Sequence, residues 1–227
     1  MWSNPEKRFA ARWFWRVAVG ESLGFAVATM VALSVILADL PAVPAVVLTI
    51  AGGVVEGAVL GLAQHAAMRA NQPSRRPWVA ATAAGAGVAW TLGMLPSTLG
   101  LDVGMPAMWV LLGAGAVVLL ASIPVGQALV LRRRGALRWA AVNTGAWAVA
   151  VLWTAAPSPF IDERSPIALV AGLYVAAGLL MAGTIALLTA PAAVRLFAVR
   201  SPAARHAAPF GRVDRSLGAP FHPELRQ

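Results

Sequence analysis

The chain contains six apolar stretches of about the length that a helix needs to cross a lipid bilayer. Such a helix takes roughly 20 apolar residues, with a range of about 17–25. The six stretches are 13–37, 44–68, 78–95, 106–131, 139–156 and 167–189. Only 12% of all residues are charged, whereas a soluble domain carries roughly 25%. The sequence therefore predicts an all-α integral membrane protein with six transmembrane helices.

The first helix is expected to begin before its apolar stretch. Ser3 or Asn4 is a suitable N-cap, Pro5 suits the first helical position and Glu6 lies in the first turn. The following residues mix aromatic and basic side chains: Trp2, Lys7, Arg8, Phe9, Arg12, Trp13, Phe14, Trp15 and Arg16. This mixture is typical of an anchor at the level of the lipid headgroups. The apolar stretch exceeds the roughly 7–15 residues of a signal peptide, which predicts a retained helix.

The basic residues predict the orientation. Of the 18 Lys and Arg, all except Arg164 lie in the N-terminal segment, in 69–76, in 132–138 or from 195 onward. The alternate turns contain Asp39, Asp102 and 162–164. By the positive-inside rule both termini are cytoplasmic, and the expected partners are the bilayer and its anionic headgroups. This position explains the net charge of +9 without nucleic acid. The Ala, Gly and Arg content is typical of a GC-rich bacterial genome, which indicates a multi-pass protein of the bacterial plasma (inner) membrane.

Several residues recur at an interval of 63 positions. The threefold matches are Arg12, Arg75 and Arg138; Arg69, Arg132 and Arg195; and Gly52, Gly115 and Gly178. They divide a transmembrane domain, 1–195, into three tandem two-helix hairpin repeats, 7–69, 70–132 and 133–195. Parallel repeats are related by an axis along the membrane normal, which predicts a pseudo-threefold bundle. The alternative is an irregular bundle descended from duplication. We expect 196–227 to be a flexible basic cytoplasmic tail.

Part of the repeat resembles uncharacterised bacterial multi-pass membrane proteins. Gly57-x-x-x-Gly61-x-x-Gln64 precedes Arg69, and Gln127 precedes Arg132. These elements are similar to the G-x-x-x-G-x-x-Q…R helix units of that group. The helices that begin at 78 and 139 resemble the intervening spans. The chain departs from the pattern at Pro124 and Ala190. The resemblance implies a fold and carries no activity.

Glycines predict where helices pack. Gly53, Gly57 and Gly61 recur at four-residue spacing, and small residues so spaced let membrane helices approach closely. We interpret this row as a helix-packing surface. Gly20 and Gly24 on the first helix, and 113–115 on the fourth, are the expected partners or equivalents.

Glu56 is the main candidate for a functional site. It lies near the middle of the second helix, where an ionised acid costs about 2.5–3.5 kcal/mol to insert. Its repeat equivalents are Leu119 and Ala182, so it is no part of the shared pattern. Two readings stay open, a proton or cation site and a protonated carboxyl hydrogen-bonded between helices. The other candidates for an ion, proton or substrate site are Glu21, Gln64, His65, Gln127 and Asn143. Glu21, Gln64, His65 and Asn143 are expected to form a polar vestibule below Glu56 on the cytoplasmic side. For Gln64 and Gln127, which recur in the repeat, a structural clamp between helices is favoured over a ligand site.

No enzyme motif is recognisable. The chain has no cysteine, which excludes thiolate chemistry, and it lacks the usual hydrolase, P-loop, dinucleotide-binding and metalloprotease patterns. We therefore predict no catalytic residue, no metal and no cofactor. Transport or permeation of a small solute, ion or proton is narrowly favoured. The alternative is a structural or accessory protein that packs against a membrane protein partner or a second copy. An intramembrane enzyme is the least favoured class.

Overall fold

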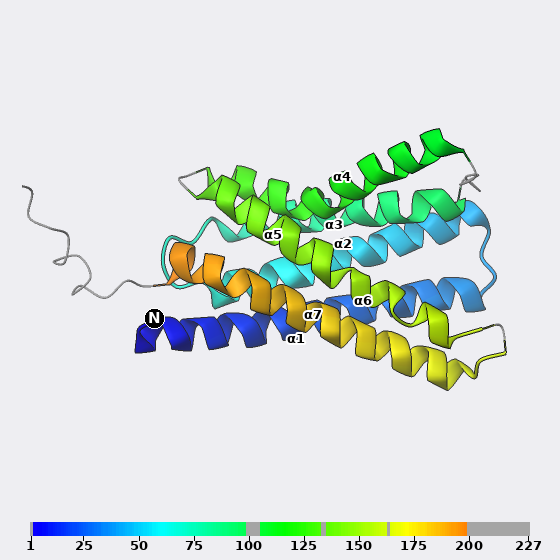
Figure 1. The fold of residues 1–227 in the computed structure, drawn as a ribbon, viewed down its shortest axis with the longest axis horizontal. Coiled ribbons are helices and arrows are strands. Elements are labelled where there is room, and N and C mark those ends of the chain that lie inside the picture. Colours follow the sequence, from blue (N-terminus) through cyan, green and yellow to red (C-terminus); the bar gives the residue numbers. More distant parts are fainter. Residues whose placement is uncertain (1, 99–104, 133–134, 163, 199–227) are drawn as a thin grey trace, which may run out of the picture.

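The computed structural model describes residues 2–98, 105–132, 135–162 and 164–198. The described residues form helices and turns, with no strand among them. The helices are α1 (Asn4–Leu37), α2 (Ala42–Ala67), α3 (Arg75–Thr98), α4 (Pro106–Leu131), α5 (Ala136–Ala150), α6 (Leu152–Ala155), the 3-10 helix η1 (Ser158–Phe160) and α7 (Ile167–Phe197). The long helices run side by side along one axis, with α6 continuing the direction of α5 (Figure 1).

Four of the described helices, α1, α2, α4 and α7, are long and apolar enough to cross a membrane. The other two predicted spans are not among these four. α3 has 24 residues. α5 has only 15 residues before the helix is interrupted at Val151. The architecture is compatible with a membrane protein, while six spans and their orientation stay predictions.

Several predicted helix ends differ from the structure. α1 begins at Asn4, with Ser3, one of the two predicted N-caps, in that position and a bond of 2.9 Å from its N–H to Glu6 Oε2. Pro5 is therefore the second helical residue and not, as predicted, the first. The third helix does not stop before Pro96, and the last continues through Pro191 to Phe197. A proline inside a helix costs about 3 kcal/mol. Burial of the last turn of α7 against the core offsets this cost, because Ala193 and Phe197 are fully buried.

Packing between neighbours closes the helices into a ring. α1 packs against α2, α2 against α3, α3 against α4 and α4 against α5. α5 then packs against α7, and α7 returns to α1. The first and last helices therefore lie side by side (Figure 1). If α5 and α6 are counted as one interrupted helix, the ring has six helices, and residues from all of them face a common interior.

The predicted glycine row lies at the α2–α3 contact. A Cβ atom on Gly53 would lie 2.0 Å from Trp90 Cδ1, and one on Gly57 would lie 2.5 Å from Ala86 Cβ. Gly61 likewise faces Thr82 at 3.1 Å. Only a residue without a side chain allows this approach. By contrast, a Cβ atom on Gly113 or Gly115 would meet nothing within 4 Å among the described residues, so these two glycines are not packing partners there. The alternative, that they are repeat equivalents, stays a prediction.

An aromatic cluster fills the interior near the end of the bundle where α1 begins. Trp13, Trp78, Trp139 and Phe197 are fully buried, and their ring centroids lie 5.6–6.2 Å apart in five contacting pairs. Hydrogen bonds from Arg69 N and Ala70 N to Phe197 O, at 3.2 and 2.9 Å, tie the end of α7 to the loop after α2. We call the four aromatic residues Trp13, Trp78, Trp139 and Phe197 the aromatic plug.

The predicted headgroup anchor is wrong for part of its residues. Trp2 and Trp15 are exposed, as an anchor requires, but Phe9 and Trp13 are buried in the core. Trp13 Nε1 donates a hydrogen bond of 3.0 Å to Thr189 Oγ1 of α7. The difference arises because α7 packs beside α1 at this level and covers one face of it. Composition alone cannot tell a Trp that faces lipid from one that faces another helix.

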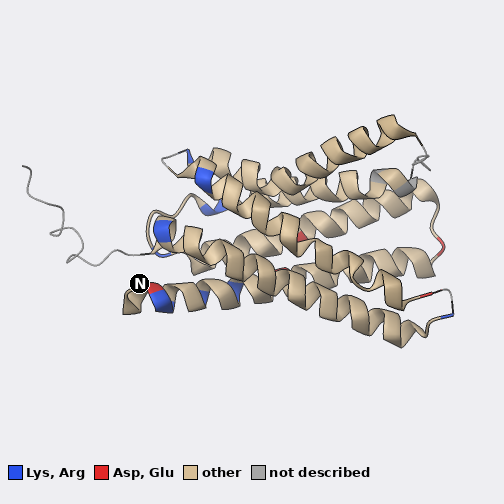
Figure 2. Cartoon of the chain, viewed as in Figure 1, with Lys and Arg blue, Asp and Glu red and all other residues tan. Residues whose placement is uncertain are grey.

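Charged residues gather at the two ends of the molecule. Lys and Arg lie mainly at the end where the N-terminus begins (Figure 2). Asp39 and Asp162 lie in turns at the opposite end, beyond the ends of α1 and η1. There the Ser165 hydroxyl, at 2.9 Å, and the Arg164 N–H, at 3.0 Å, donate to Asp162 Oδ1 and lower the pKa of this carboxyl. Position 102 and the basic tail beyond 198 lie outside the described residues.

Candidate functional site

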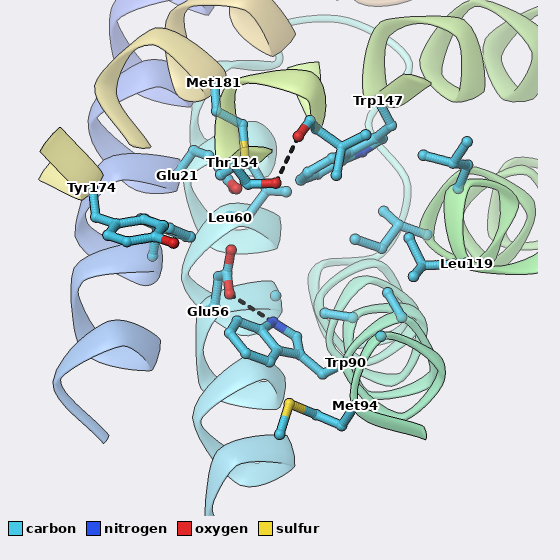
Figure 3. Close-up of a pocket in the computed structure, with 18 residues that line it drawn as sticks. Glu21, Glu56, Leu60, Trp90, Met94, Leu119, Trp147, Thr154, Tyr174 and Met181 are labelled. Carbon is cyan, nitrogen blue, oxygen red and sulfur yellow. Dashed lines mark hydrogen bonds between the residues drawn. The ribbon is translucent and has the colours of Figure 1, made fainter. Parts of the chain in front are cut away.

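The interior of the ring contains a cavity of about 340 Å³. Its lining is mostly apolar and includes residues from each of the helices α1 to α7. Two acids, Glu21 of α1 and Glu56 of α2, lie in its wall together with the aromatic residues Trp90, Trp147 and Tyr174 (Figure 3). Phe25 of α1 also belongs to the lining. No Lys, Arg or His belongs to the lining. The cavity is therefore acidic and aromatic in an otherwise apolar interior.

The close approach of α1 and α2 brings the two acids together. A Cβ atom on Gly24 would lie 2.9 Å from Glu56 O and 3.1 Å from Glu56 Cγ. Gly24 lies one helical turn from Glu21, so the absence of its side chain lets α2 approach at this level. Glu21 is fully buried and Glu56 is 6% exposed. The register of two antiparallel helices thus pairs acids that are far apart in the sequence.

The two carboxyl groups have different partners. Trp90 Nε1 donates a hydrogen bond of 2.8 Å to Glu56 Oε2 (Figure 3). Neither oxygen of Glu21 has a hydrogen-bond partner among the described residues. The carboxyl groups of Glu21 and Glu56 are close enough to interact, although the geometry of a direct hydrogen bond is not met. Two neighbouring carboxylates repel each other when both are ionised. A proton on one of them, or a bound cation between them, therefore stabilises the pair.

Below the acids, on the side of the aromatic plug, lies a layer of buried amides and hydroxyls. Gln127 Nε2 donates to Gln64 Oε1 at 2.7 Å and to Thr82 Oγ1 at 2.9 Å. Gln127 Oε1 accepts from Trp139 Nε1 at 3.0 Å and from Asn143 Nδ2 at 3.1 Å. Gln127 thereby joins α2, α3, α4 and α5, and its four hydrogen bonds use the full capacity of a glutamine side chain. We call Gln64, Thr82, Gln127 and Asn143 the amide layer; Trp139 of the aromatic plug bonds to it.

The structure divides the candidate residues into groups. Glu21 and Glu56 lie at the cavity, whereas Gln64, Gln127 and Asn143 belong to the amide layer, which is buried at 1% exposure or less. His65 takes part in neither group, because its Nε2 lies 3.1 Å from Pro73 O in the loop after α2. The expected vestibule is therefore absent from the described part of the chain. The amide layer and the plug separate the cavity from the arginine-rich end.

Sequence reasoning missed two parts of the site. The contact between Trp90 and Glu56 has no signal in the sequence. The plug residues Trp13 and Trp139 are separated by two intervals of 63, and this spacing could have identified them as equivalent buried positions. Among the described residues, no group of three or more His, Asp or Glu could hold a metal ion.

Comparisons with protein-family models, with curated proteins and with solved structures give no match.

Proposed function

We propose that this chain is a multi-pass membrane protein that moves protons or small cations, with Glu21 and Glu56 as the binding site inside the helix ring. The observation that carries the proposal is the acid pair at the 340 Å³ cavity, with neither oxygen of Glu21 in a hydrogen bond. Ionisable residues within membrane helices usually face a bundle interior or cavity and belong to ion or proton pathways. A purely structural glutamate would be expected to have its hydrogen bonds satisfied.

The proposal includes an orientation. The arginine-rich end faces the cytoplasm, by the positive-inside rule, and three hairpins related by the interval of 63 residues build the ring. The direct bond between Gln64 and Gln127, which are 63 positions apart, supports related hairpins. In this orientation the cavity lies on the outer side of the plug, so the structure corresponds to a state closed toward the cytoplasm. Release to that side would require the plug and the amide layer to separate.

The test is ion flux into vesicles that contain the purified protein. A membrane potential is imposed, internal pH is followed with a trapped dye, and K⁺ and Na⁺ are followed in separate runs. We expect wild-type protein to move at least one of these ions faster than protein-free vesicles. Glu56→Gln and Glu21→Gln should reduce the flux to the protein-free level, because an amide cannot bind a proton or carry a negative charge.

The matched control is Asp162→Asn, which removes an exposed acid at the end of the bundle far from the plug. It should leave the flux unchanged. Equal stability of all variants in detergent excludes misfolding as the cause of a loss. Wild-type vesicles that behave like protein-free ones, or a fully active Glu56→Gln variant, would contradict the proposal.

A second candidate, an accessory protein that packs against a partner, is favoured by one observation. Trp109, Val110 and Leu111 in the first turns of α4 are 63, 75 and 60% exposed. Three successive exposed residues mean that helices of the described chain cover little of this part of α4, which also leans away from the bundle in Figure 1. Purification of a stable complex through this surface, together with absence of flux, would favour the accessory function.

A further inference from the structure

The aromatic lining of the cavity points to the chemical class of the cation. Phe25, Trp90, Trp147 and Tyr174 come from α1, α3, α5 and α7 and line the same cavity as the two acids. Trp90, Trp147 and Tyr174 are labelled in Figure 3. The faces of aromatic rings attract cations, most strongly when water is excluded. A site for protons alone has no need of four rings from four helices. This wall suits an organic cation with an apolar body.

The hydrogen-bonding groups narrow the class further. Both oxygens of the buried Glu21 lack a donor, whereas Glu56 already accepts from Trp90. The bound group is therefore expected to bring its own N–H donors. A hard metal cation needs about six oxygen ligands, but the lining offers few beyond the two carboxyls. Its hydroxyls are those of Thr154 and Tyr174, and the Thr154 hydroxyl already donates to Val151 O at 2.6 Å.

We propose that the cavity binds a monovalent protonated amine carried on a small apolar or aromatic body, with its ammonium group at Glu21 and Glu56. A volume of about 340 Å³ lies at the lower end of the range for small-molecule pockets, about 300–1,000 Å³, which fits a body of one ring. The inference deepens the function proposed above and uses the same acid pair. Failure of the amine proposal can nevertheless be distinguished from failure of the proposed transport function, because binding and flux are measured separately.

Binding is expected to release a proton. When the acid pair holds a proton, the ammonium group replaces it: R–NH₃⁺ and a carboxylic acid give a carboxylate–ammonium pair and one free H⁺. Charge and atoms balance without a further reactant. The same pair of carboxyl groups would then bind either the amine or the proton, which is the property required to exchange one for the other.

The test is titration calorimetry of the full chain in detergent with 2-phenylethylammonium chloride as the probe. Two buffers with different ionisation enthalpies count the protons released. Three further compounds separate the contributions: 2-phenylethanol has the ring without the charge, methylammonium has the charge without the ring, and trimethyl(2-phenylethyl)ammonium has both without an N–H. We expect the primary amine to bind most tightly, with release of one proton.

Variants assign the site. Glu21→Gln or Glu56→Gln should weaken amine binding by about tenfold or more, because each removes a hydrogen bond between charged groups. Each variant should also abolish the proton release. Trp147→Leu should weaken binding of the amine and leave the proton count unchanged. Asp162→Asn should bind like wild type. Equal binding of 2-phenylethanol and the amine, an unchanged affinity in both glutamine variants, or no binding at all would overturn the inference.

The flux assay then separates the two proposals. Ion flux that depends on Glu56, without amine binding, would leave the proposed function standing and overturn the amine. Amine binding without flux of any ion would support the amine site and contradict transport.

Discussion

At the level of single residues, Gln127 shows how a polar side chain can be stabilised inside an apolar bundle. Its amide accepts two hydrogen bonds and donates two, from 2.7 to 3.1 Å. Burial of a polar group is costly only where its hydrogen bonds are lost. Glu21, equally buried, makes none with the described residues. This contrast separates a residue that holds helices together from one that is available to a ligand.

Replacing Gln127 by Leu is expected to lower the stability of the bundle. Trp139 and Asn143 would lose their acceptor, and each unpaired buried group costs about 1–3 kcal/mol. Gln64→Leu removes only one of the bonds to Gln127 and should cost less. Unfolding of the purified variants by denaturant in mixed micelles measures the difference. A Gln127→Leu variant as stable as wild type would show that the amide layer contributes nothing to stability.

At the level of helices, glycines set the distances between axes. The residues of α3 that face Gly53, Gly57 and Gly61 are Trp90, Ala86 and Thr82, also four residues apart. The two antiparallel rows therefore remain in register over two turns. The same close packing, at Gly24, aligns Glu21 with Glu56 across α1 and α2.

Gly57→Ala is expected to destabilise the contact between α2 and α3. The added Cβ would lie 2.5 Å from Ala86 Cβ and 2.8 Å from Thr82 O, so the helices must separate, at a cost of about 1–3 kcal/mol for an overpacked interior. Gly113→Ala is the matched control, because its Cβ meets nothing within 4 Å. Alanine has the higher helix propensity, so this control should be neutral or slightly stabilising. Thermal unfolding in detergent compares the two, and an equal loss in both would refute the assignment of the interface.

At the level of the whole molecule, the ring has three layers along its axis. The aromatic plug lies at the arginine-rich end, the amide layer follows, and the acidic cavity lies beyond it. Buried polar atoms without a hydrogen-bond partner among the described residues occur in each layer: Trp78 Nε1 in the plug, Asn143 Oδ1 in the amide layer and both oxygens of Glu21 at the cavity. Glu21 is the only acid in this group of described residues. Under the proposed function, the orientation in the membrane would decide which compartment has access to it.

The orientation can be measured directly because the chain contains no cysteine. Ser74 lies in the loop after α2 at the arginine-rich end, and Ser158 lies at the other end, and both are exposed. A membrane-impermeant maleimide should label Ser158→Cys in intact cells, and Ser74→Cys only after the membrane is made permeable. The reverse pattern would invert the proposed topology and turn the cavity toward the cytoplasm.

Much of the architecture could be predicted from local patterns. The apolar stretches located the helices, and the predicted bounds of 106–131 agree with α4 at both ends. Helix ends at prolines were predicted less well, because the gain from burying Phe197 outweighs the local cost of Pro191. Glu56 stood out by its charge alone. Its partner Glu21 was grouped with Gln64 and His65 by depth, since depth is the only coordinate that a sequence supplies for a membrane helix.

The sequence by itself determined which segments are helical, which residues are too polar to face lipid and which end of the bundle is basic. These properties depend on composition and on spacing within one helix. Only the tertiary structure decided that Trp13 faces the core, that His65 turns to a loop and that Glu21 meets Glu56. The physical reason is that rotation and register between helices depend on close packing at positions such as Gly24 and Gly57. A shift of one residue there would separate the acids and close the site.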